Sequence, residues 1–260
     1  MTIPLLAICA IARNEASYIE EWIAFHRRQG VTLFRIYDNA SLDGTSEVCR
    51  AQGVELIYWN DVSSDFDQQQ TAAYLDGARQ MAGRAAWVGF INIDEFIFGR
   101  YGRPLAKTLA MMPAGVGAVA VQQRVFGSGG QITRVAGGVV ERFIHCAPLD
   151  HSEHLWFKTI ARPDHVDGFD SVHSVVLRAG SYVMQDGSPL VRKPGQYQSS
   201  RHAAEGAIGL HHYMLKSLEE FRQKQIKWVD RGIPGRLDDS YFLWREGFAN
   251  LIECREAIDL

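Results

Sequence analysis

The sequence lacks the features that mark several common classes of protein. Its 260 residues include only four cysteines, none in a CxxC pair or at the spacing of zinc ligands. We therefore interpret the cysteines as small buried fillers in a reducing compartment. The formal net charge of −3 gives no electrostatic case for a nucleic-acid partner.

A long hydrophobic segment is also missing. Residues 1–12 are apolar but too few to cross a bilayer, and no basic segment precedes them. The stretch PLLAICAIA is better interpreted as a first buried strand. We expect a cytoplasmic location, with peripheral association at the inner face of the membrane as the alternative.

Glycine-rich phosphate-binding motifs are absent as well. No GxGxxG follows the first predicted strand, and no GxxxxGK[ST] occurs. These absences argue against a dinucleotide Rossmann site and a P-loop, so a phosphate-bearing ligand needs another source of positive charge. The histidine-rich segment 145–173 lacks HExxH, and its HSEH falls in a predicted loop, which disfavours structural zinc there.

Strands and helices alternate over the first hundred residues. Continuous apolar runs predict strands, and helical spacing of apolar residues predicts the segments between them. This alternation indicates an open, mostly parallel α/β sheet with right-handed crossovers. The predicted strands are 5–12, 31–38, 54–59 and 85–94, and the helices are 18–29, 45–52 and 68–83.

The pattern loosens after Phe98. No linker or repeat is evident, so we expect one domain, 1–260, with two functional halves, 1–100 and 101–260. The later predictions are strands at 117–127, 137–144, 155–161 and 207–213, and helices at 217–232 and 239–258.

Polar residues follow each of the four parallel strands. In open α/β sheets, ligands bind beyond the carboxyl ends of the strands, so these residues predict a site. They are Arg13, Asn14 and Glu15; Asp38, Asn39, Ser41 and Asp43; Asp61 and Asp65; and Asn92, Asp94 and Glu95.

The heptapeptide FINIDEF, residues 90–96, places two acids at the end of a buried run. Asn92 and Asp94 alternate with an isoleucine, which in a strand puts both on one face. Oxygen ligands of this kind suit Mg²⁺ or Mn²⁺, and His212 could add an imidazole. The alternatives are a helix cap or salt bridge for Asp94 and Glu95, and a packing role for His212.

Several segments resemble glycosyltransferase family 92 and its bacterial relatives. They are IARNEASYIEEWIAFHRRQGV, IYDNASLDGT, INIDEF and HYMLKSLEEFRQK, in order from residue 8 to about 232. The resemblance implies a family-two-like GT-A fold and transfer of a sugar from a nucleotide sugar. Residues 1–100 would then bind the nucleotide sugar, and residues 101–260 the acceptor.

The resemblance also implies roles for matched positions. Asn92-Ile93-Asp94 takes the place of a DxD motif in which the second acid binds the metal directly. Here Asn92 replaces the first acid and brings no charge, although it can hydrogen-bond a ribose hydroxyl. Arg13, Asn14 and Glu15 would line the nucleoside pocket, Asp38 with Asn39 and Ser41 would face the base or ribose, His212 would be a further metal ligand, and Lys158, Arg162 and Lys216 would reach the diphosphate or acceptor.

The reaction requires negative charge on the leaving diphosphate to be neutralised, which a divalent ion does without proton transfer. An inverting reaction also needs a carboxylate base near the acceptor hydroxyl. We place Glu153 in that role, and the resemblance places His173 in the active site. Other candidate bases are Asp150, Asp167, Asp170 and Glu95, and each candidate, Glu153 included, could instead be a solvated loop acid. Trp156, Phe157, Phe169 and Tyr213 could stack on sugar rings or pack in the core.

We therefore expect a metal-assisted, inverting glycosyltransferase. It would use Mn²⁺ or Mg²⁺ and a UDP-sugar to build a polysaccharide or glycolipid. Two alternatives remain open. A sugar-nucleotide nucleotidyltransferase would normally carry a glycine-rich loop with Arg and Lys after strand one, which the stretch ARNEAS lacks. A non-catalytic carbohydrate- or nucleotide-binding relative is compatible with Asn92.

Overall fold

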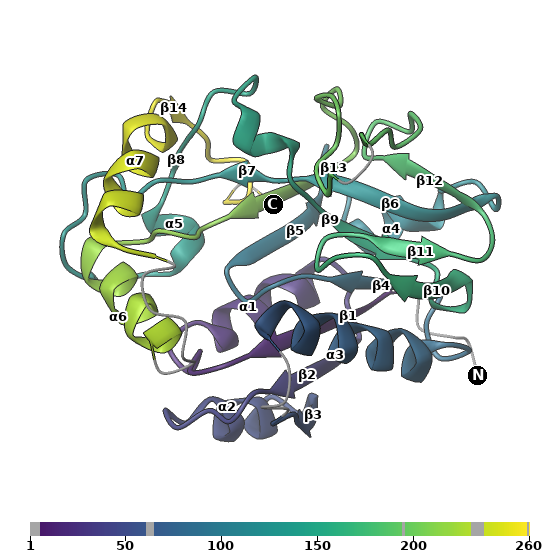
Figure 1. Ribbon diagram of the computed structural model, residues 1–260, viewed down its shortest axis with the longest axis horizontal. Coiled ribbons are helices and arrows are strands. Elements are labelled where there is room, and N and C mark those ends of the chain that lie inside the picture. The colour runs from purple at the N-terminus through teal and green to yellow at the C-terminus, as the bar shows by residue number, and fades with distance from the viewer. Residues whose placement is uncertain (1–5, 61–64, 194–195, 230–236, 259) are drawn as a thin grey trace. The chain divides into compact units, whose positions relative to one another are not determined.

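The structure is a computed structural model that describes residues 6–60, 65–193, 196–229, 237–258 and 260. It divides into two units, whose segments interleave along the chain (Figure 1). Unit 1 comprises Met1–Gln123 and Leu155–Leu210, and unit 2 comprises Arg124–His154 and His211–Leu260. The predicted boundary at residue 100 therefore does not coincide with a structural one, and the functional halves stay a prediction.

Unit 1 is built on a seven-stranded sheet in the order β12-β6-β9-β4-β1-β2-β3. β9 is antiparallel to both of its neighbours, and the other neighbouring pairs are parallel. The predicted fold class, an open, mixed, mostly parallel sheet flanked by helices, is confirmed. The strands are β1 (Leu6–Ala12), β2 (Leu33–Asp38), β3 (Glu55–Tyr58), β4 (Trp87–Phe90), β6 (Val116–Gln122), β9 (Phe157–Ala161) and β12 (Ser181–Met184).

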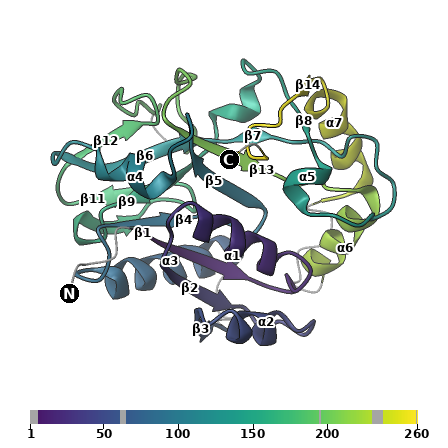
Figure 2. The same cartoon turned by 180° about the vertical axis from the view of Figure 1, so that it is seen from behind.

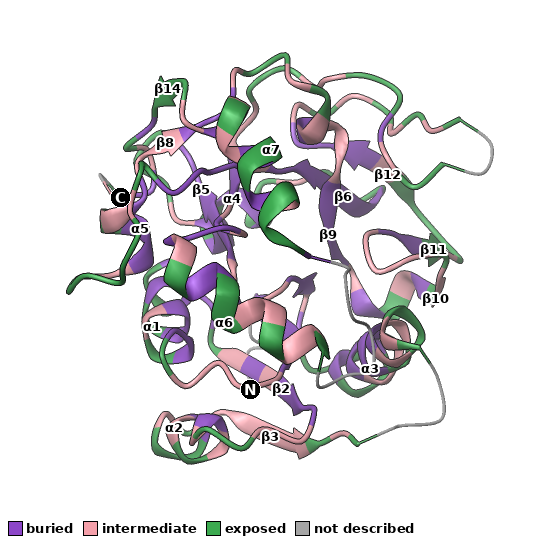
Figure 3. Ribbon diagram, turned by 60° about the vertical axis from the view of Figure 1, so that its left-hand side comes forward, coloured by how far each residue is buried: buried purple, intermediate pink, exposed green. Residues whose placement is uncertain are grey.

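Helices cover both faces of this sheet. Figure 1 shows α3 (Phe66–Met81) in front of the strands, and Figure 2, from behind, shows α1 (Ile19–Arg28) and α4 (Leu105–Ala110) on the other face. The short helix α2 (Thr45–Ala51) packs on β2 and β3. Every residue of β1 and β6 is buried, as expected for strands covered on both faces (Figure 3).

The remaining elements of unit 1 are short. β10 and β11 form an antiparallel hairpin, and β5 follows β4 directly after a turn. Their bounds are β5 (Glu95–Gly99), the 3₁₀ helix η2 (Pro163–His165), β10 (Val166–Phe169) and β11 (Val175–Leu177).

Unit 2 is mainly helical, with a small core of Leu215, Phe221, Leu237 and Phe242. Two short strand pairs complete it: His211 and His212 of β13 (Ile208–His212) pair with β7, and β8 pairs antiparallel with β14. The elements are β7 (Arg124–Val125), α5 (Val139–Arg142), β8 (His145–Cys146), the 3₁₀ helix η1 (Ser152–Leu155), α6 (Leu218–Val229), α7 (Asp239–Ala249) and β14 (Ile252–Glu253).

Most of the unit 1 elements were predicted within a few residues, but three other predictions were wrong. The predicted strand 137–144 contains the helix α5, because packing overrides the strand preference of its valines. The predicted helix 239–258 ends at Ala249 and continues into β14. The predicted strand 117–127 is divided into β6 and β7 at Gln123, whose backbone N–H donates to Trp156 O.

No helix among the described residues is long and apolar enough to cross a membrane.

Candidate nucleotide-sugar site

The loops after β1 and β2 are tied together by hydrogen bonds. The backbone N–H of Asn14 donates to Ser41 Oγ at 2.9 Å, and that of Leu42 donates to Asn14 Oδ1 at 2.7 Å. The N–H of Glu15 donates to Thr45 Oγ1 at 2.7 Å. Asn14 and Ser41, predicted to line a nucleoside pocket, thus also fix the shape of the loops around it.

Two residues in these loops have left-handed backbone conformations, Asn14 with φ 54° and Ala40 with φ 55°. For a residue with a Cβ, this conformation costs about 1–2 kcal/mol. Asn tolerates it readily, but Ala does not, so the surrounding hydrogen bonds must impose it. Strain of this kind concentrates at binding sites, which supports the predicted place of the site.

Asp38, the last residue of β2, is buried and held in one orientation. One carboxylate oxygen accepts from the N–H of Ser41 at 3.1 Å, and the other accepts from Ser46 Oγ at 2.6 Å. Asp38 also lines a surface pocket of about 360 Å³. Arg50 and Tyr58, which sequence reasoning missed, line it too, with Ser46, Val54 and Leu56.

Asn39 has a different role from its neighbour. Its side-chain amide is buried and donates to Trp59 O at 2.8 Å and to Gln69 Oε1 at 3.2 Å. These bonds connect the end of β2 to the segment after β3 and to α3. The predicted contact of Asn39 with a base or ribose is therefore not supported. Asp61, after β3, lies outside the described residues.

Arg13 follows β1 directly and is half-buried. Its Nε atom is buried and has no hydrogen-bond partner among the described residues. A buried N–H without a partner carries a desolvation cost of about 1–3 kcal/mol, which an anionic ligand could offset. Arg13 is thus a cation at the carboxyl edge of the sheet, where a phosphate-bearing ligand is predicted.

The segment Asn92–Glu95 is a turn between β4 and β5 and not the end of a strand. The N–H of Glu95 donates to Asn92 O at 3.2 Å across it. The strand argument for a shared face of Asn92 and Asp94 is therefore wrong. Asn92 Oδ1 accepts from Gln70 Nε2 at 2.6 Å and from Tyr74 Oη at 3.3 Å, which uses both lone pairs and argues against Asn92 as a metal ligand.

Glu95 confirms the salt-bridge alternative. Its carboxylate is buried, accepts from the N–H of Asn92 at 2.7 Å and lies 3.6 Å from Lys158 Nζ. Lys158 also donates to Val172 O at 3.3 Å. Since a buried, paired ammonium presents no face to a ligand, the prediction that Lys158 reaches the diphosphate is not supported.

Arg162 is at the wrong edge of the sheet for its predicted role. β9 is antiparallel to β4, so its last residue, Ala161, pairs with Val88 near the start of β4. The Arg162 guanidinium lies over the Trp87 ring at 4.3 Å and donates to Val116 O. It therefore lies at the edge opposite to Asn92–Glu95.

A stripe on α1 holds this turn and the strand that follows it. The indole N–H of Trp22 donates to Asn92 O at 3.1 Å and Glu95 O at 2.8 Å. His26 Nε2 accepts from the N–H of Ile97, and burial lowers the pKa of His26 to about 3. Gln29 Oε1 accepts from the N–H groups of Gly99 and Leu105.

Trp22, His26 and Gln29 are spaced i, i+4, i+7, so they share one helix face. The spacing was visible in the sequence, but their shared target was not. Trp22 and His26 belong to the segment IARNEASYIEEWIAFHRRQGV, which resembles the family. They thus act on the site through the backbone that carries Asp94.

Asp94, the other acid of the turn, is half-buried. It lies near Tyr74, whose pKa is raised well above its ordinary value by burial, by Glu95 and, to a smaller extent, by Asp94. Mg²⁺ and Mn²⁺ are commonly bound through one or two carboxylates plus phosphate oxygens. Asp94 fits the role of such a single protein ligand in unit 1.

The predicted acceptor region of unit 1 contains a half-buried pair of aromatic rings. The rings of Trp156 and His173 lie 4.7 Å apart, both half-buried, and His173 Nδ1 lies 3.0 Å from Phe157 O. Phe157 and Phe169 pack in hydrophobic clusters of unit 1. They therefore have the core-packing role that was the alternative to stacking on sugar rings.

Two of the candidate bases in unit 1 are already ion-paired. Asp170 lies 2.7 Å from Arg192 Nη2, and Asp167 lies 3.3 Å from Arg178 Nη2. Asp150, in unit 2, is exposed.

The other predicted site residues belong to unit 2. His212 is half-buried at the end of β13, and Lys216 is buried with φ 57°. Glu153, the predicted base, is bound to Arg245 with an Nη2–Oε2 distance of 2.5 Å. This contact occupies a carboxylate oxygen of Glu153 and holds the side chain in one place, which weakens the case for Glu153 as the base that reaches an acceptor hydroxyl. Tyr213 is buried.

The fold and the strand-end cluster define a class: an α/β protein with a carboxylate-bearing site beyond the carboxyl ends of its parallel strands. Residues 6–121 match the family model described as glycosyltransferase family 92. A family 92 protein of Oryza sativa subsp. japonica is 26% identical over 224 residues, 84% of this chain and 35% of that protein. One of Ricinus communis is 28% identical over 235 residues, 86% of this chain and 38% of that protein.

The chain is thus similar to glycosyltransferase family 92, to its family model over residues 6–121 and to its curated members over most of the chain. It spans little more than a third of the length of these curated relatives. Among solved structures, glucosyl-3-phosphoglycerate synthase from Mycobacterium tuberculosis has a TM-score of 0.42 at 15% identity, over 90% of this chain and 82% of that one. Similarity at that level is too low to transfer residue roles.

Proposed function

We propose that this chain is a metal-assisted glycosyltransferase that moves a sugar from a nucleotide sugar, in particular a UDP-sugar, to a glycan or glycolipid acceptor with inversion. The similarity to glycosyltransferase family 92 supports the class of reaction. The observation that carries the proposal is the place of Asp94, whose half-buried carboxylate lies in the turn Asn92–Glu95 beyond the carboxyl end of β4.

The donor would lie along the carboxyl ends of β1, β2 and β4. Asp38 accepts two hydrogen bonds from its own loop and lines the adjacent pocket, so it can orient a nucleoside there. Arg13, with its unpartnered Nε, is the cation that can contact the phosphates. Gln70 and Tyr74 of α3 donate to Asn92 Oδ1, and the side-chain NH₂ of Asn92 could donate to a ribose or phosphate oxygen.

A Mn²⁺ or Mg²⁺ ion held by Asp94 would neutralise charge on the leaving diphosphate. The chain's own contribution is rigidity. Trp22, His26 and Gln29 fix the backbone from Asn92 to Leu105, so the carboxylate of Asp94 is pre-positioned. Pre-organised charges of this kind lower the barrier, because no reorganisation is needed during the reaction.

The proposal is tested by calorimetric titration with UDP, with and without Mn²⁺. We expect UDP binding that Mn²⁺ strengthens, and loss of the Mn²⁺ effect in Asp94→Asn. The matched control is Glu47→Gln, an exposed acid on α2, which should behave like the wild type. UDP binding of equal affinity with and without Mn²⁺ would favour a non-catalytic nucleotide-binding protein. No UDP binding at all would overturn the proposal.

A panel of nucleotide sugars then identifies the donor. Wild-type protein with Mn²⁺ should hydrolyse or transfer one class of nucleotide sugar, and Asp94→Asn should lower that rate at least about 100-fold, the scale expected for a group that stabilises transition-state charge. Release of pyrophosphate from a sugar phosphate and a nucleoside triphosphate would instead identify a nucleotidyltransferase.

A further inference from the structure

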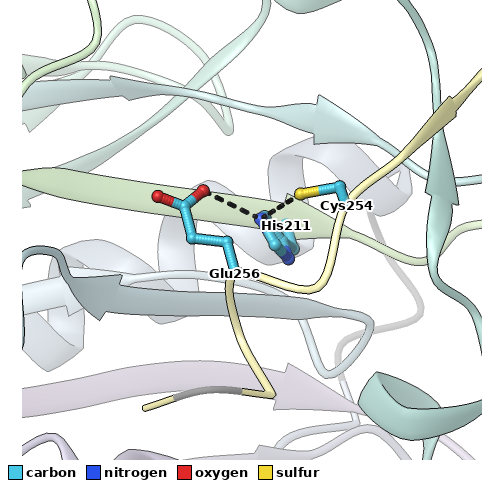
Figure 4. Close-up of side chains that lie close together, drawn as sticks. All are labelled: His211, Cys254 and Glu256. Atoms are coloured by element: carbon cyan, nitrogen blue, oxygen red, sulfur yellow. Dashed lines mark hydrogen bonds and ion pairs between the residues drawn. The ribbon is translucent and has the colours of Figure 1, made fainter.

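Three side chains with metal-ligand atoms meet in unit 2, in a place that the proposed function does not use. His211 Nε2 lies 3.8 Å from Cys254 Sγ and 3.6 Å from Glu256 Oε2, and Figure 4 shows both interactions converging on that nitrogen. The three ligand atoms lie within 4.8 Å of one another. Around a tetrahedral zinc ion with bonds of about 2.0–2.3 Å, neighbouring ligand atoms lie roughly 3.3–3.8 Å apart.

The strand pair β8–β14 carries a candidate for a fourth ligand, Cys146, which lies outside that group of three mutually close atoms. Cys146 is opposite Ile252, and the N–H of Cys254 donates to Ile144 O, so the two cysteines are diagonal neighbours on one face of the pair. Both cysteines are buried and free of disulfides.

The surroundings are those of a metal-ligating histidine. His211 Nδ1 lies 3.1 Å from Tyr213 Oη, which fixes the ring with Nε2 toward Cys254 and Glu256. Such an outer partner on the second ring nitrogen is usual for metal-ligating histidines. The imidazole and the thiol of this cluster are hidden from solvent, since His211 is fully buried and Cys254 is 9% exposed.

Charge balance also fits. Two thiolates and one carboxylate around a divalent ion leave one net negative charge. Arg124 supplies the compensating positive charge: its Nη1 lies 3.2 Å from Cys254 Sγ and 3.6 Å from Glu256 Oε2. A guanidinium next to the thiolate sulfur hydrogen-bonds it and offsets its charge.

We propose that Cys146, His211, Cys254 and Glu256 bind a thiophilic divalent cation, zinc in particular, as a structural site of unit 2. Thiolates and imidazole select zinc over the oxygen-preferring Mg²⁺ and Mn²⁺. A set of four protein ligands leaves no open position, which is the mark of a structural and not a catalytic site. The ion would join three segments of unit 2 that are distant in sequence.

The test begins with metal content. Protein expressed with zinc in the medium and purified with reductant but without chelator should contain about one zinc per chain. Cys254→Ser should lose it, and the matched control Cys49→Ser, a buried free cysteine on α2 of unit 1, should keep it. Asp94→Asn should also keep it, which separates this site from the proposed Mn²⁺ site.

Because Cys254→Ser could fail to fold, a second variant and a spectrum support the test. Glu256→Gln, with a side chain 30% exposed, should fold and bind zinc about 10-fold more weakly or worse. Cobalt in place of zinc should give a sulfur-to-metal charge-transfer band, absent in Cys254→Ser. Fully reduced protein that binds no zinc, zinc retained in both variants, or a Cys146–Cys254 disulfide in metal-free native protein would each overturn the proposal.

Discussion

The two units assemble their polar clusters in opposite ways. In unit 1, Asp38 is the last residue of β2 and Asp94 lies in the turn after β4, so the sheet brings together residues that are local to each strand end. In unit 2, the cluster of Cys146, His211 and Cys254 comes from three separate segments joined by short strand pairs. A parallel sheet makes the position of a site predictable, and an irregular unit does not.

Each unit also contains a buried ion pair, and here the two are alike. Glu95 and Lys158 are 3.6 Å apart in unit 1, and Arg142 and Glu220 are 2.5 Å apart in unit 2. Both carboxylates accept further hydrogen bonds from backbone N–H groups, of Asn92 and of Ser217. Substitutions that remove one charge from each pair test whether the two pairs stabilise the protein in the same way.

The largest effect is expected from Lys158→Met. It leaves the Glu95 carboxylate buried without its cation, which should lower the free energy of unfolding by about 3–5 kcal/mol. Urea denaturation followed by circular dichroism measures this. The double variant Lys158→Met, Glu95→Gln removes both charges and should recover a large part of the loss; equal destabilisation in the single and double variants would contradict the ion-pair account.

The next effect concerns Glu220 and depends on pH. Burial acts to raise its pKa, but hydrogen bonds from Arg142 and Ser217 outweigh it and lower the pKa from 4.5 to about 2. Because the pKa in the fold lies below its ordinary value, this stabilisation is complete above pH 4.5 and is lost as pH falls toward 2.

Glu220→Gln should therefore be less stable than the wild type by about 3 kcal/mol at pH 7, with the difference shrinking below pH 4.5. Denaturation curves of both proteins from pH 7 to 3 measure it. A difference that stays constant over this range would show that the charge of Glu220 is not its source.

A smaller effect is expected from Trp22→Phe. The carbonyl groups of Asn92 and Glu95 lose their shared donor, and this loss alone should cost about 1–3 kcal/mol. The smaller phenyl ring also leaves part of the buried indole volume unfilled, which adds to the loss. If Trp22 positions the turn, the Mn²⁺-dependent part of UDP binding should weaken as well. The control Trp244→Phe, on an exposed ring of α7, should change neither quantity.

Sequence reasoning located the turn Asn92–Glu95 but gave a wrong account of its parts. It could not tell that Glu95 is neutralised by Lys158, because the two are 63 positions apart in the chain and meet only through the pairing of β4 with β9. For the same reason it assigned Lys158 and Arg162 to the ligand, although the antiparallel direction of β9 buries one and carries the other to the far edge.

The sequence by itself determined the strand–helix alternation of unit 1, its parallel sheet and the edge at which its polar loops gather, because apolar periodicity and turn residues are local signals. Only the tertiary structure decided which charges are paired, which face of α1 holds the turn, and that two cysteines interpreted as scattered fillers meet beside His211. Those outcomes depend on contacts between distant segments, and no local pattern records such contacts.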